Sequence, residues 1–362
     1  MLDFLYKDEL NIVVVGDIRL TPDRIEQALV NSPVKFKNIK KVFWGSTVDE
    51  DWFSIKQLNI ECNGPEAEAY AKDLDAAVPD ADVLISHMCP IPRSLLEKGK
   101  NLRAVLSCRG GLENIDVKAA CDLGIPVVNV IRNAVSVAEF AVGLILSVTR
   151  NIASSHHLIM GGVWERNFPN SDCIPTLEDL KVGLAGLGNI GIELAKRLKA
   201  LGVPLLAYEP YPDWPRLERN GLGDIEMVPT LEDLFRQSDL ISLHLRLTEE
   251  TRGIIDSKYF SLMKPAAYFM NTARGGLVNQ DDLVQALREQ RIAGAALDVF
   301  DSEPLRKDAG FDGLNNVTLT SHLAGTTFTA LANAPVQLLR EVDKIVRMDA
   351  VERIVNYKQL NL

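Results

Sequence analysis

The chain has 362 residues, of which 47% are hydrophobic and 24% charged, and its formal net charge at pH 7 is -10. This length predicts two domains, and the acidic balance argues against nucleic acid as a partner. The N-terminal MLDFLYKDEL does not resemble a signal peptide, no apolar run is long enough to span a bilayer, and the five cysteines lack a Cys-x-x-Cys pair, so we expect a cytoplasmic protein with neither a membrane partner nor a metal site.

The first 133 residues alternate short, β-branched apolar runs with helical patterns. The apolar runs have strand length and cover residues 11–17, 40–46, 82–88, 103–108 and 126–130. Helical spacing lies between several of them, as in PRSLLEKGK and VKAACDLG. Alternation of this kind predicts a parallel sheet with helices on both faces.

One long helix is predicted next, from about Val135 to Ile159. Its segment AVSVAEFAVGLILSVTRNI is apolar on more than one face, whereas an ordinary surface helix has a single apolar stripe. We therefore predict a homodimer that buries this segment. The alternative is a helix fully buried within one subunit.

A second alternating series follows the predicted helix. Its six apolar runs cover residues 181–188, 204–210, 239–245, 266–273, 294–300 and 317–323. They predict a dinucleotide-binding domain over residues 134–323, inserted into a first α/β domain of residues 1–133. Residues 324–362 read as helix and are predicted to return to the first domain. A cleft between the two domains is then the expected ligand site.

The stretch GLAGLGNIG predicts a dinucleotide-binding turn, because Gly186, Gly188 and Gly191 have the spacing G-x-G-x-x-G after an apolar strand. Asn189 and Ile190 open the following helix, whose free N–H groups suit phosphate. Glu209 ends the second strand, where a carboxylate binds the ribose 2′-hydroxyl and repels a 2′-phosphate. We therefore predict NAD as the cofactor, with NADP disfavoured.

Three later strand ends carry groups suited to catalysis. They are NTARGGLVN, GAALDVFDSEP and TSHLAGTT, and they bring Arg274, Glu303 and His322 to one edge of the sheet. Arginine suits carboxylate binding, and histidine beside a carboxylate suits proton transfer near neutral pH. Taken singly, His322 could be a structural histidine, and Arg274 and Glu303 could form a plain ion pair.

With these motifs, the chain from about Asp82 onward resembles the D-isomer-specific 2-hydroxyacid dehydrogenases. CRGGLENIDVKAACDLGIPVVNV is similar to that family's substrate loop, and NAVSVAEFAVGLILSVTR resembles its interdomain helix. The resemblance implies an α/β fold of two doubly wound parallel-sheet domains, a Rossmann domain inserted into a flavodoxin-like substrate domain. It also implies NAD-dependent interconversion of a 2-oxo acid and its D-2-hydroxy acid.

The resemblance assigns roles residue by residue. His322 would transfer the proton, Glu303 would stabilise the imidazolium, and Arg274 would bind the substrate carboxylate together with the backbone of Gly110 and Gly111. The remaining residues expected at the cofactor are His244, Thr272, Ala273, Asp298 and Gly325. The pattern departs from the family at Asp179, at Arg246 and at Ile131–Arg132, and the last departure leaves the substrate open.

Two readings compete with this one. Some relatives act as NADH-sensing partners of other proteins with little turnover, and a formate dehydrogenase would share the fold but pairs its histidine with glutamine. Arg109 and Arg132 flank the substrate loop and would suit a substrate with a second anionic or polyhydroxylated end. Solvated surface arginines are the alternative there.

Overall fold

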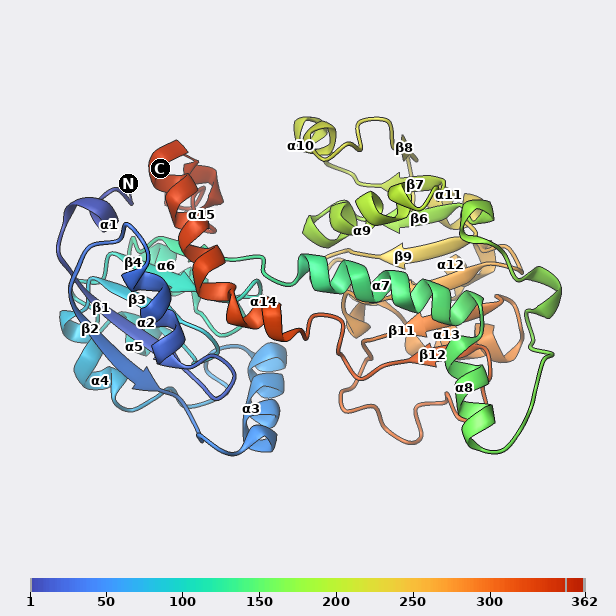
Figure 1. Cartoon of the computed structure of the whole chain (residues 1–362), viewed down its shortest axis with the longest axis horizontal. Coiled ribbons are helices and arrows are strands. Elements are labelled where there is room, and N and C mark those ends of the chain that lie inside the picture. The colour runs from blue at the N-terminus through green and yellow to red at the C-terminus, as the bar shows by residue number, and fades with distance from the viewer. Residues whose placement is uncertain (1, 349, 361–362) are drawn as a thin grey trace. The chain divides into compact units, whose positions relative to one another are not determined.

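The computed structural model describes residues 2–348 and 350–360. Its contacts divide the chain into two compact units, Met1–Asn133 with Thr327–Leu362, and Ala134–Thr326. We refer to them as the first and the second unit. The chain therefore leaves the first unit once and comes back to it, as the colours of Figure 1 show.

The first unit contains a five-stranded parallel sheet with the strand order β2-β1-β3-β4-β5. This order is the flavodoxin-like one. The strands are β1 (Leu10–Gly16), β2 (Phe36–Phe43), β3 (Val83–Ser86), β4 (Ala104–Ser107) and β5 (Val127–Asn129). All five correspond to apolar runs predicted from the sequence, and β2 begins four residues earlier than its run.

Helices cover both faces of this sheet, because alternate strand residues point to opposite sides. Ile12 and Val14 pack with α1 (Phe4–Lys7), α2 (Pro22–Val30) and α15 (Ala334–Met348). Val13 and Val15 pack with α3 (Glu50–Asn63), α4 (Leu74–Ala77), α5 (Arg93–Leu96) and α6 (Val117–Asp122). Figure 1 shows α15 beside α2, so the two ends of the chain share one core. The short α14 (Phe328–Ala332) precedes α15.

The second unit contains a seven-stranded parallel sheet in the order β12-β11-β10-β9-β6-β7-β8. Counted from β6, this is the doubly wound dinucleotide-binding order with one strand added at an edge. The strands are β6 (Val182–Ala185), β7 (Leu205–Tyr208), β8 (Glu226–Met227), β9 (Leu240–Leu243), β10 (Tyr268–Asn271), β11 (Gly294–Leu297) and β12 (Val317–Leu319). The sequence predicted six of them. It missed β8 because two residues at a sheet edge give no apolar run.

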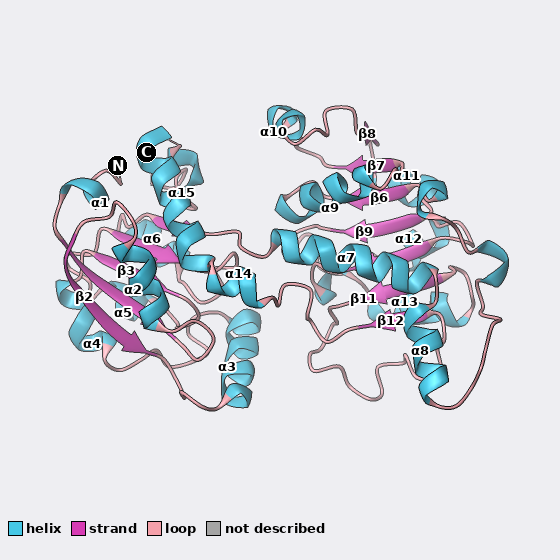
Figure 2. Ribbon diagram, in the orientation of Figure 1, coloured by secondary structure: helices cyan, strands magenta, loops and turns pink. Residues whose placement is uncertain are grey.

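Two helical layers enclose this sheet as well, and Figure 2 shows the strands between them. On one face lie α7 (Ala134–Thr149), α9 (Asn189–Ala200) and α10 (Trp214–Arg219). On the other lie α11 (Leu231–Gln237), α12 (Ser257–Leu262) and α13 (Gln280–Arg288). Polar side chains fix where several helices begin: Thr230 and Asn279 each accept a backbone N–H of their own helix, α11 and α13.

The predicted long helix from Val135 to Ile159 is wrong. The segment forms two helices, α7 and α8 (Ile152–Met160), bent by 66°. Asn151 adopts a left-handed φ of 56° at the break, and its Nδ2 donates to Oδ1 of Asn170 at 2.7 Å. Nδ2 of Asn170 in turn donates to the carbonyl of Thr149, so the open end of α7 is satisfied by side chains.

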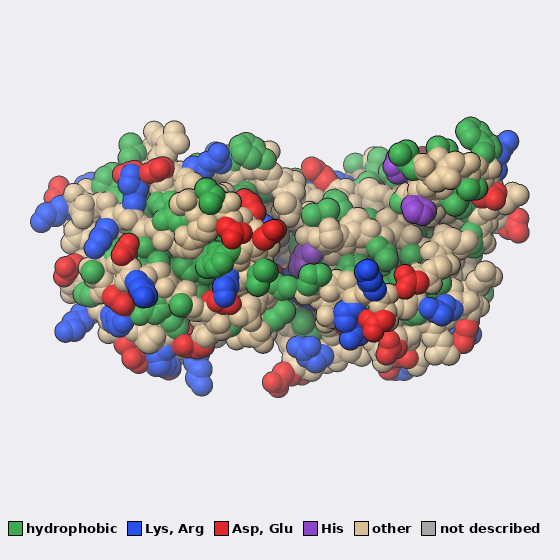
Figure 3. Space-filling view, turned by 90° about the horizontal axis from the view of Figure 1, so that it is seen from below, with side chains coloured by type: hydrophobic (Ala, Val, Ile, Leu, Met, Phe, Trp, Pro, Cys, Tyr) green, Lys and Arg blue, Asp and Glu red, His purple; other side chains and the backbone are tan. Residues whose placement is uncertain are grey.

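In the described part of the chain, no single helix is long and apolar enough to cross a bilayer. Only the bent pair of α7 and α8, taken together, has the required length and apolar composition. Acidic and basic side chains are interspersed over the face drawn in Figure 3.

Candidate active site

The three glycines of the turn between β6 and α9 lie in different surroundings. Gly186 has a φ of 102°, and a Cβ on it would lie 2.9 Å from the carbonyl oxygen of His244. A Cβ on Gly191 would lie 2.2 Å from the oxygen of Gly186. A Cβ on Gly188 would meet nothing within 4 Å. Packing therefore requires two of the glycines, and the third borders open space beside the N-terminus of α9.

Glu209 is held beside this turn at the end of β7. Its Oε2 accepts the N–H of Leu187 at 2.9 Å, and its Oε1 accepts the N–H of Tyr211 at 3.2 Å. Arg216 reaches the same region, where its Nη2 donates to Oδ1 of Asn189 at 2.7 Å. A carboxylate and a guanidinium thus both lie against the residues that flank Gly188. Ile190 is the second residue of α9.

Two buried polar atoms at neighbouring strand ends have no hydrogen-bond partner in the described protein: Nδ1 of His244 and Oγ1 of Thr272. Nε2 of His244 lies 2.8 Å from Oγ of Ser242, and burial lowers the pKa of His244 to about 4, so the ring is neutral at physiological pH. Ala273 is fixed by its N–H, which donates to Oδ1 of Asn271. Orphaned buried polar atoms beside an open glycine turn fit a polar group that the protein binds. The residues are thus suited to a dinucleotide.

His322 and Glu303 form a hydrogen-bonded pair in the second unit. Nδ1 of His322 lies 2.7 Å from Oε2 of Glu303, and Oε1 of that carboxylate accepts the N–H of Phe300 at 3.0 Å. A carboxylate only accepts, so Nδ1 carries the proton and Nε2 is the nitrogen directed away from Glu303. His322 has a φ of 55°, a left-handed conformation that is uncommon outside glycine.

The buried carboxylate of Asp298 holds this strained turn. It accepts the N–H of Leu323 at 2.8 Å and the N–H of Ala324 at 2.9 Å, and the hydroxyl of Thr320 at 2.6 Å. The N–H of His322 also donates to the carbonyl of Asp298 at 2.9 Å. Asp298 therefore positions His322, and Gly325 follows directly. The predicted contacts of Asp298 and Gly325 with the cofactor stay predictions.

Arg274 follows β10 and is exposed. Its Nη1 donates to the carbonyl of Ala273 at 2.8 Å, and its own carbonyl accepts from Nδ2 of Asn271. A Cβ on Gly275 would lie 1.7 Å from the oxygen of Phe300. The loop of Arg274 is thus packed directly against the loop that leads to Glu303, and the second unit gathers the three predicted catalytic residues on adjacent strand ends.

The predicted substrate loop of the first unit follows β4. Oxygen of Gly110 accepts from Nδ2 of Asn129 at 2.6 Å, which ties this loop to β5. The backbone N–H groups of Gly110 and Gly111 have no acceptor among the described residues. Arg109, by contrast, is buried, and its Nη2 lies 2.8 Å from Glu61 and 3.5 Å from Glu113. Its charge is therefore neutralised within the first unit, and sequence reasoning missed both of these acidic partners.

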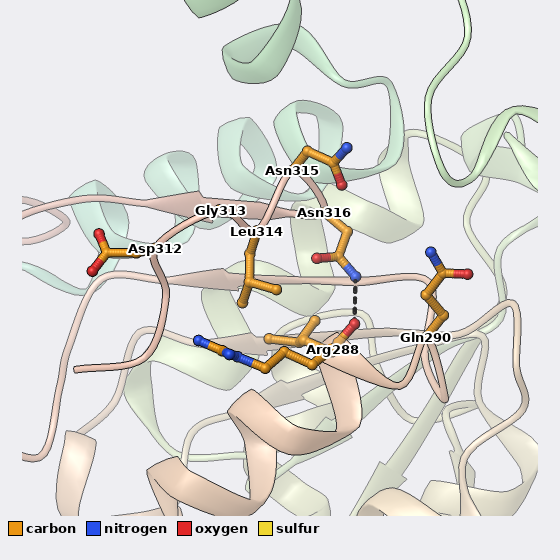
Figure 4. A pocket seen from close by; sticks show the side chains of 8 residues that line it. Arg288, Gln290, Asp312, Gly313, Leu314, Asn315 and Asn316 are labelled. Carbon is orange, nitrogen blue, oxygen red and sulfur yellow. Dashed lines mark hydrogen bonds between the residues drawn. The ribbon is translucent and has the colours of Figure 1, made fainter. Parts of the chain in front are cut away.

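A surface pocket of about 240 Å³ lies elsewhere in the second unit (Figure 4). Its lining comes from the end of α13 and from the loop before β12, including Arg288, Gln290 and Asn316. Nδ2 of Asn316 donates to the carbonyl of Leu287 across it. These segments lead into the amino ends of β11 and β12, whereas the candidate site lies at the carboxyl ends of the strands. The pocket is therefore separate from the candidate site.

Comparison with known proteins agrees with this arrangement. Residues 142–324 match the family model described as the NAD binding domain of D-isomer specific 2-hydroxyacid dehydrogenases. The chain is 36% identical to a D-3-phosphoglycerate dehydrogenase of Methanocaldococcus jannaschii over 79% of its length, but it spans only 53% of that protein. It is 34% identical to a glyoxylate reductase of Thermofilum pendens, covering 79% of this chain and 84% of the relative.

Among solved structures, an NADPH-dependent glyoxylate/hydroxypyruvate reductase of Sinorhizobium meliloti superposes with a TM-score of 0.66 and 25% identity. The match covers 93% of this chain and 95% of the reductase. Half of the chain thus matches one family model, and relatives above 30% identity cover most of it. Together with the glycine turn and the His322–Glu303 pair, this shows that the chain belongs to the D-isomer specific 2-hydroxyacid dehydrogenases.

Proposed function

We propose that the protein interconverts a 2-oxo acid and its D-2-hydroxy acid, with NADH and NAD as the coenzyme pair. The observation that carries this proposal is the His322–Glu303 pair, which lies in the same unit as the glycine turn. Glu303 and His322 follow β11 and β12, and Arg274 follows the adjacent strand β10. A nicotinamide dinucleotide, when bound, supplies the hydride in reduction and accepts it in oxidation. The chain's own residues must bind the acid, place C2, and move one proton.

His322 is the proposed proton carrier. Because Nδ1 donates to Glu303, the proton that reaches the oxygen at C2 of the substrate comes from Nε2. In reduction His322 gives up this proton and becomes neutral; in oxidation it takes the hydroxyl proton and becomes an imidazolium. Glu303 stabilises the imidazolium, and its second oxygen is already fixed by Phe300.

Arg274 is the proposed ligand of the substrate carboxylate, through charge-assisted and bidentate hydrogen bonds. The backbone N–H groups of Gly110 and Gly111, which have no acceptor among the described residues, are proposed as substrate ligands in the first unit. Two donors of fixed direction would orient the acid so that one face of C2 is presented for hydride transfer. Orientation of this kind is a large part of what an enzyme contributes.

The glycine turn and Glu209 are proposed to bind the dinucleotide. Gly186, Gly188 and Gly191 with Asn189 and Ile190 would face the pyrophosphate, Glu209 the ribose hydroxyls, and His244, Thr272 and Ala273 the nicotinamide half. The carboxylate of Glu209 supports NAD over NADP. One similar structure is named NADPH-dependent, and Arg216 donates to Asn189 beside the glycine turn, where a guanidinium would favour a 2′-phosphate. The preference for NAD is therefore a proposal with its own test.

A panel of 2-oxo acids, assayed by the loss of NADH absorbance, tests the proposed function. The names of the relatives direct the choice to glyoxylate, hydroxypyruvate and a phosphorylated 2-oxo acid. Sustained turnover with at least one of them is the expected result. NADH binding without turnover of any panel member would instead favour a binding protein and would overturn the proposal.

A further inference from the structure

Three side chains at the carboxyl ends of three strands form a hydrogen-bonded chain inside the first unit. Asp17 follows β1, His87 follows β3, and Arg132 lies in the loop after β5. Oδ2 of Asp17 is 2.7 Å from Nδ1 of His87, and Nη2 of Arg132 is 3.3 Å from Nε2 of the same ring. Asp17 and His87 are buried, and Arg132 is partly exposed. These hydrogen bonds therefore link the core to the edge of the sheet where α/β folds bind ligands.

The hydrogen bonds among Asp17, His87 and Arg132 allow only one placement of protons on the His87 ring. The carboxylate of Asp17 also accepts the N–H groups of Arg19, Leu20 and Met88, so it is ionised and can only accept. Nδ1 of His87 must then be the donor. Arginine has only donors, so Nε2 of His87 must be the acceptor of the bond from Arg132. Burial lowers the pKa of His87, which favours this neutral ring.

Arg132 differs from its neighbour Arg109 in how its charge is compensated. Arg109 pairs with Glu61 and Glu113. Among the salt bridges of the described residues, none includes Arg132, and its contact with His87 is with a neutral ring. Burial and the nearby charge of Arg109 lower the pKa of Arg132 to about 10, which leaves it cationic at neutral pH. The ionised Asp17 contacts the opposite side of the His87 ring and forms no salt bridge with Arg132 among the described residues, so the charge of Arg132 is only partly compensated. An anionic ligand would supply a direct counter-charge.

The loop that carries Arg132 lies along the predicted substrate loop. The N–H of Val130 donates to the carbonyl of Arg109 at 3.2 Å, and a Cβ on Gly110 would lie 3.6 Å from Cδ1 of Ile131. Gly110, whose N–H has no acceptor among the described residues, therefore lies beside Ile131, the residue before Arg132. An acid bound at this loop would therefore have the cationic guanidinium of Arg132 near it.

We propose that Arg132 binds a second anionic group of the substrate, a carboxylate or a phosphate, and that Asp17 and His87 are positioning residues that fix its guanidinium. This inference rests on the proposed function and narrows its substrate class to 2-oxo acids with two anionic groups. It also assigns the extra cation to Arg132 alone, since Arg109 is already neutralised.

The first test compares substrates that differ in the second charge. Wild-type protein and Arg132→Leu are assayed with 2-oxoglutarate and phosphonooxypyruvate as dianionic acids, and with 2-oxobutyrate and glyoxylate as monoanionic ones. A charge-assisted contact predicts that the wild type favours a dianionic acid in kcat/KM by about 10- to 100-fold, and that Arg132→Leu removes this preference chiefly through KM. Arg93→Leu, which removes an exposed arginine paired with Asp122, is the control and keeps the preference.

The second test separates positioning from structure. His87→Asn retains a donor near the position of Nδ1 and loses the acceptor for Arg132, whereas His87→Gln places an acceptor near the position of Nε2. KM for the dianionic acid is expected to rise several-fold more in His87→Asn than in His87→Gln, at similar thermal unfolding temperatures. Equal KM values in these two variants would overturn the positioning role.

The outcomes distinguish this inference from the proposed function. Turnover of monoanionic acids without a preference for dianionic ones, or a preference that survives Arg132→Leu, overturns the inference and leaves the proposed function intact. If no 2-oxo acid is reduced, the proposed function fails, and calorimetric titration with 2-oxoglutarate decides the site. Binding that is lost in Arg132→Leu then supports an anion site, and equal binding by the two proteins overturns it.

Discussion

At the scale of single residues, two carboxylates determine where His322 lies and which of its nitrogens can react. Asp298 fixes the backbone turn through the N–H groups of Leu323 and Ala324, and Glu303 fixes the ring through Nδ1. The carboxylate of Asp298 is buried, and the carboxylate of Glu303 contacts the imidazole ring directly. Strain at His322, with its left-handed φ, is therefore offset by bonds to one side chain.

Replacing His322 tests this division. His322→Ala is expected to lower kcat by about 100-fold or more with little change in NADH affinity, because it removes a proton donor. His157→Ala, which removes an exposed histidine of α8, is the matched control and keeps wild-type kcat. Steady-state assays and NADH fluorescence titration measure both quantities. Turnover of His322→Ala close to that of the wild type would refute the assignment.

Cofactor preference belongs to the same scale. Glu209→Ala is expected to weaken NADH binding and to narrow the gap between NADH and NADPH, because the 2′-phosphate is no longer repelled by a carboxylate. Glu218→Ala, an exposed glutamate of α10, serves as the control. Dissociation constants for both coenzymes give the answer. A wild-type protein that binds NADPH more tightly than NADH would show that Glu209 does not set the preference.

How far the sequence predicts such residues depends on whether they lie in motifs. Arg274, Glu303 and His322 follow recognisable strand ends and could be named from the sequence. His87 and Asp17 could not, because 70 residues separate them and only the sheet order places β3 next to β1. The same holds for Glu61, which lies on α3 and reaches Arg109 from 48 residues away.

At the scale of elements, apolar runs identified every described strand of three residues or more, because most strand residues are buried on both faces of the sheets. The exception is β2, which is largely exposed and whose start was predicted four residues too late. The break between α7 and α8 was not predictable from periodicity, since the apolar pattern continues through it. It depends instead on the pairing of Asn151 with Asn170, a tertiary contact. The glycine turn was recognised from spacing, but only the packing shows which glycines the fold itself requires.

Two alanine substitutions separate folding from binding in that turn. Gly191→Ala forces a Cβ against the backbone oxygen of Gly186 and is expected to cost about 1–3 kcal/mol of stability, the usual range for overpacking. Gly188→Ala meets no protein atom within 4 Å, so its unfolding temperature should stay close to the wild-type value while NADH binding weakens. Thermal unfolding and NADH titration of the two variants provide the comparison. An unstable Gly188→Ala protein, or one that binds NADH normally, would contradict this reading.

At the scale of the whole molecule, the main feature is a group of exposed apolar side chains on α8 and the loop after it. No residue of α8 is buried within the described chain, although Ile152, Ile159 and Met160 are apolar, and Trp164 beyond the helix is 81% exposed. Apolar groups so grouped mark interaction surfaces. We propose that they form the interface of a homodimer, since a two-fold pair is the commonest closed assembly. This surface differs from the predicted segment 134–152, because much of α7 is buried within the chain itself.

Sedimentation equilibrium tests the assembly. The wild type should sediment at twice the 40.0 kDa mass of one chain, and the double variant Met160→Glu with Trp164→Glu should shift toward the single-chain mass. Tyr211→Glu alters a residue that is 89% exposed in a different loop and should leave the dimer unchanged. A wild type of single-chain mass at micromolar concentration would exclude the homodimer.

The configuration of the product tests the central claim most directly. The best substrate of the 2-oxo acid panel is reduced with NADH, and the 2-hydroxy acid is resolved by chiral chromatography alongside the amount of NADH consumed. Membership of the family, with His322, Glu303 and Arg274 in the proposed roles, predicts one D-2-hydroxy acid for each NADH oxidised. Formation of the L-isomer or of a racemate, or the absence of any 2-hydroxy acid, would contradict the account.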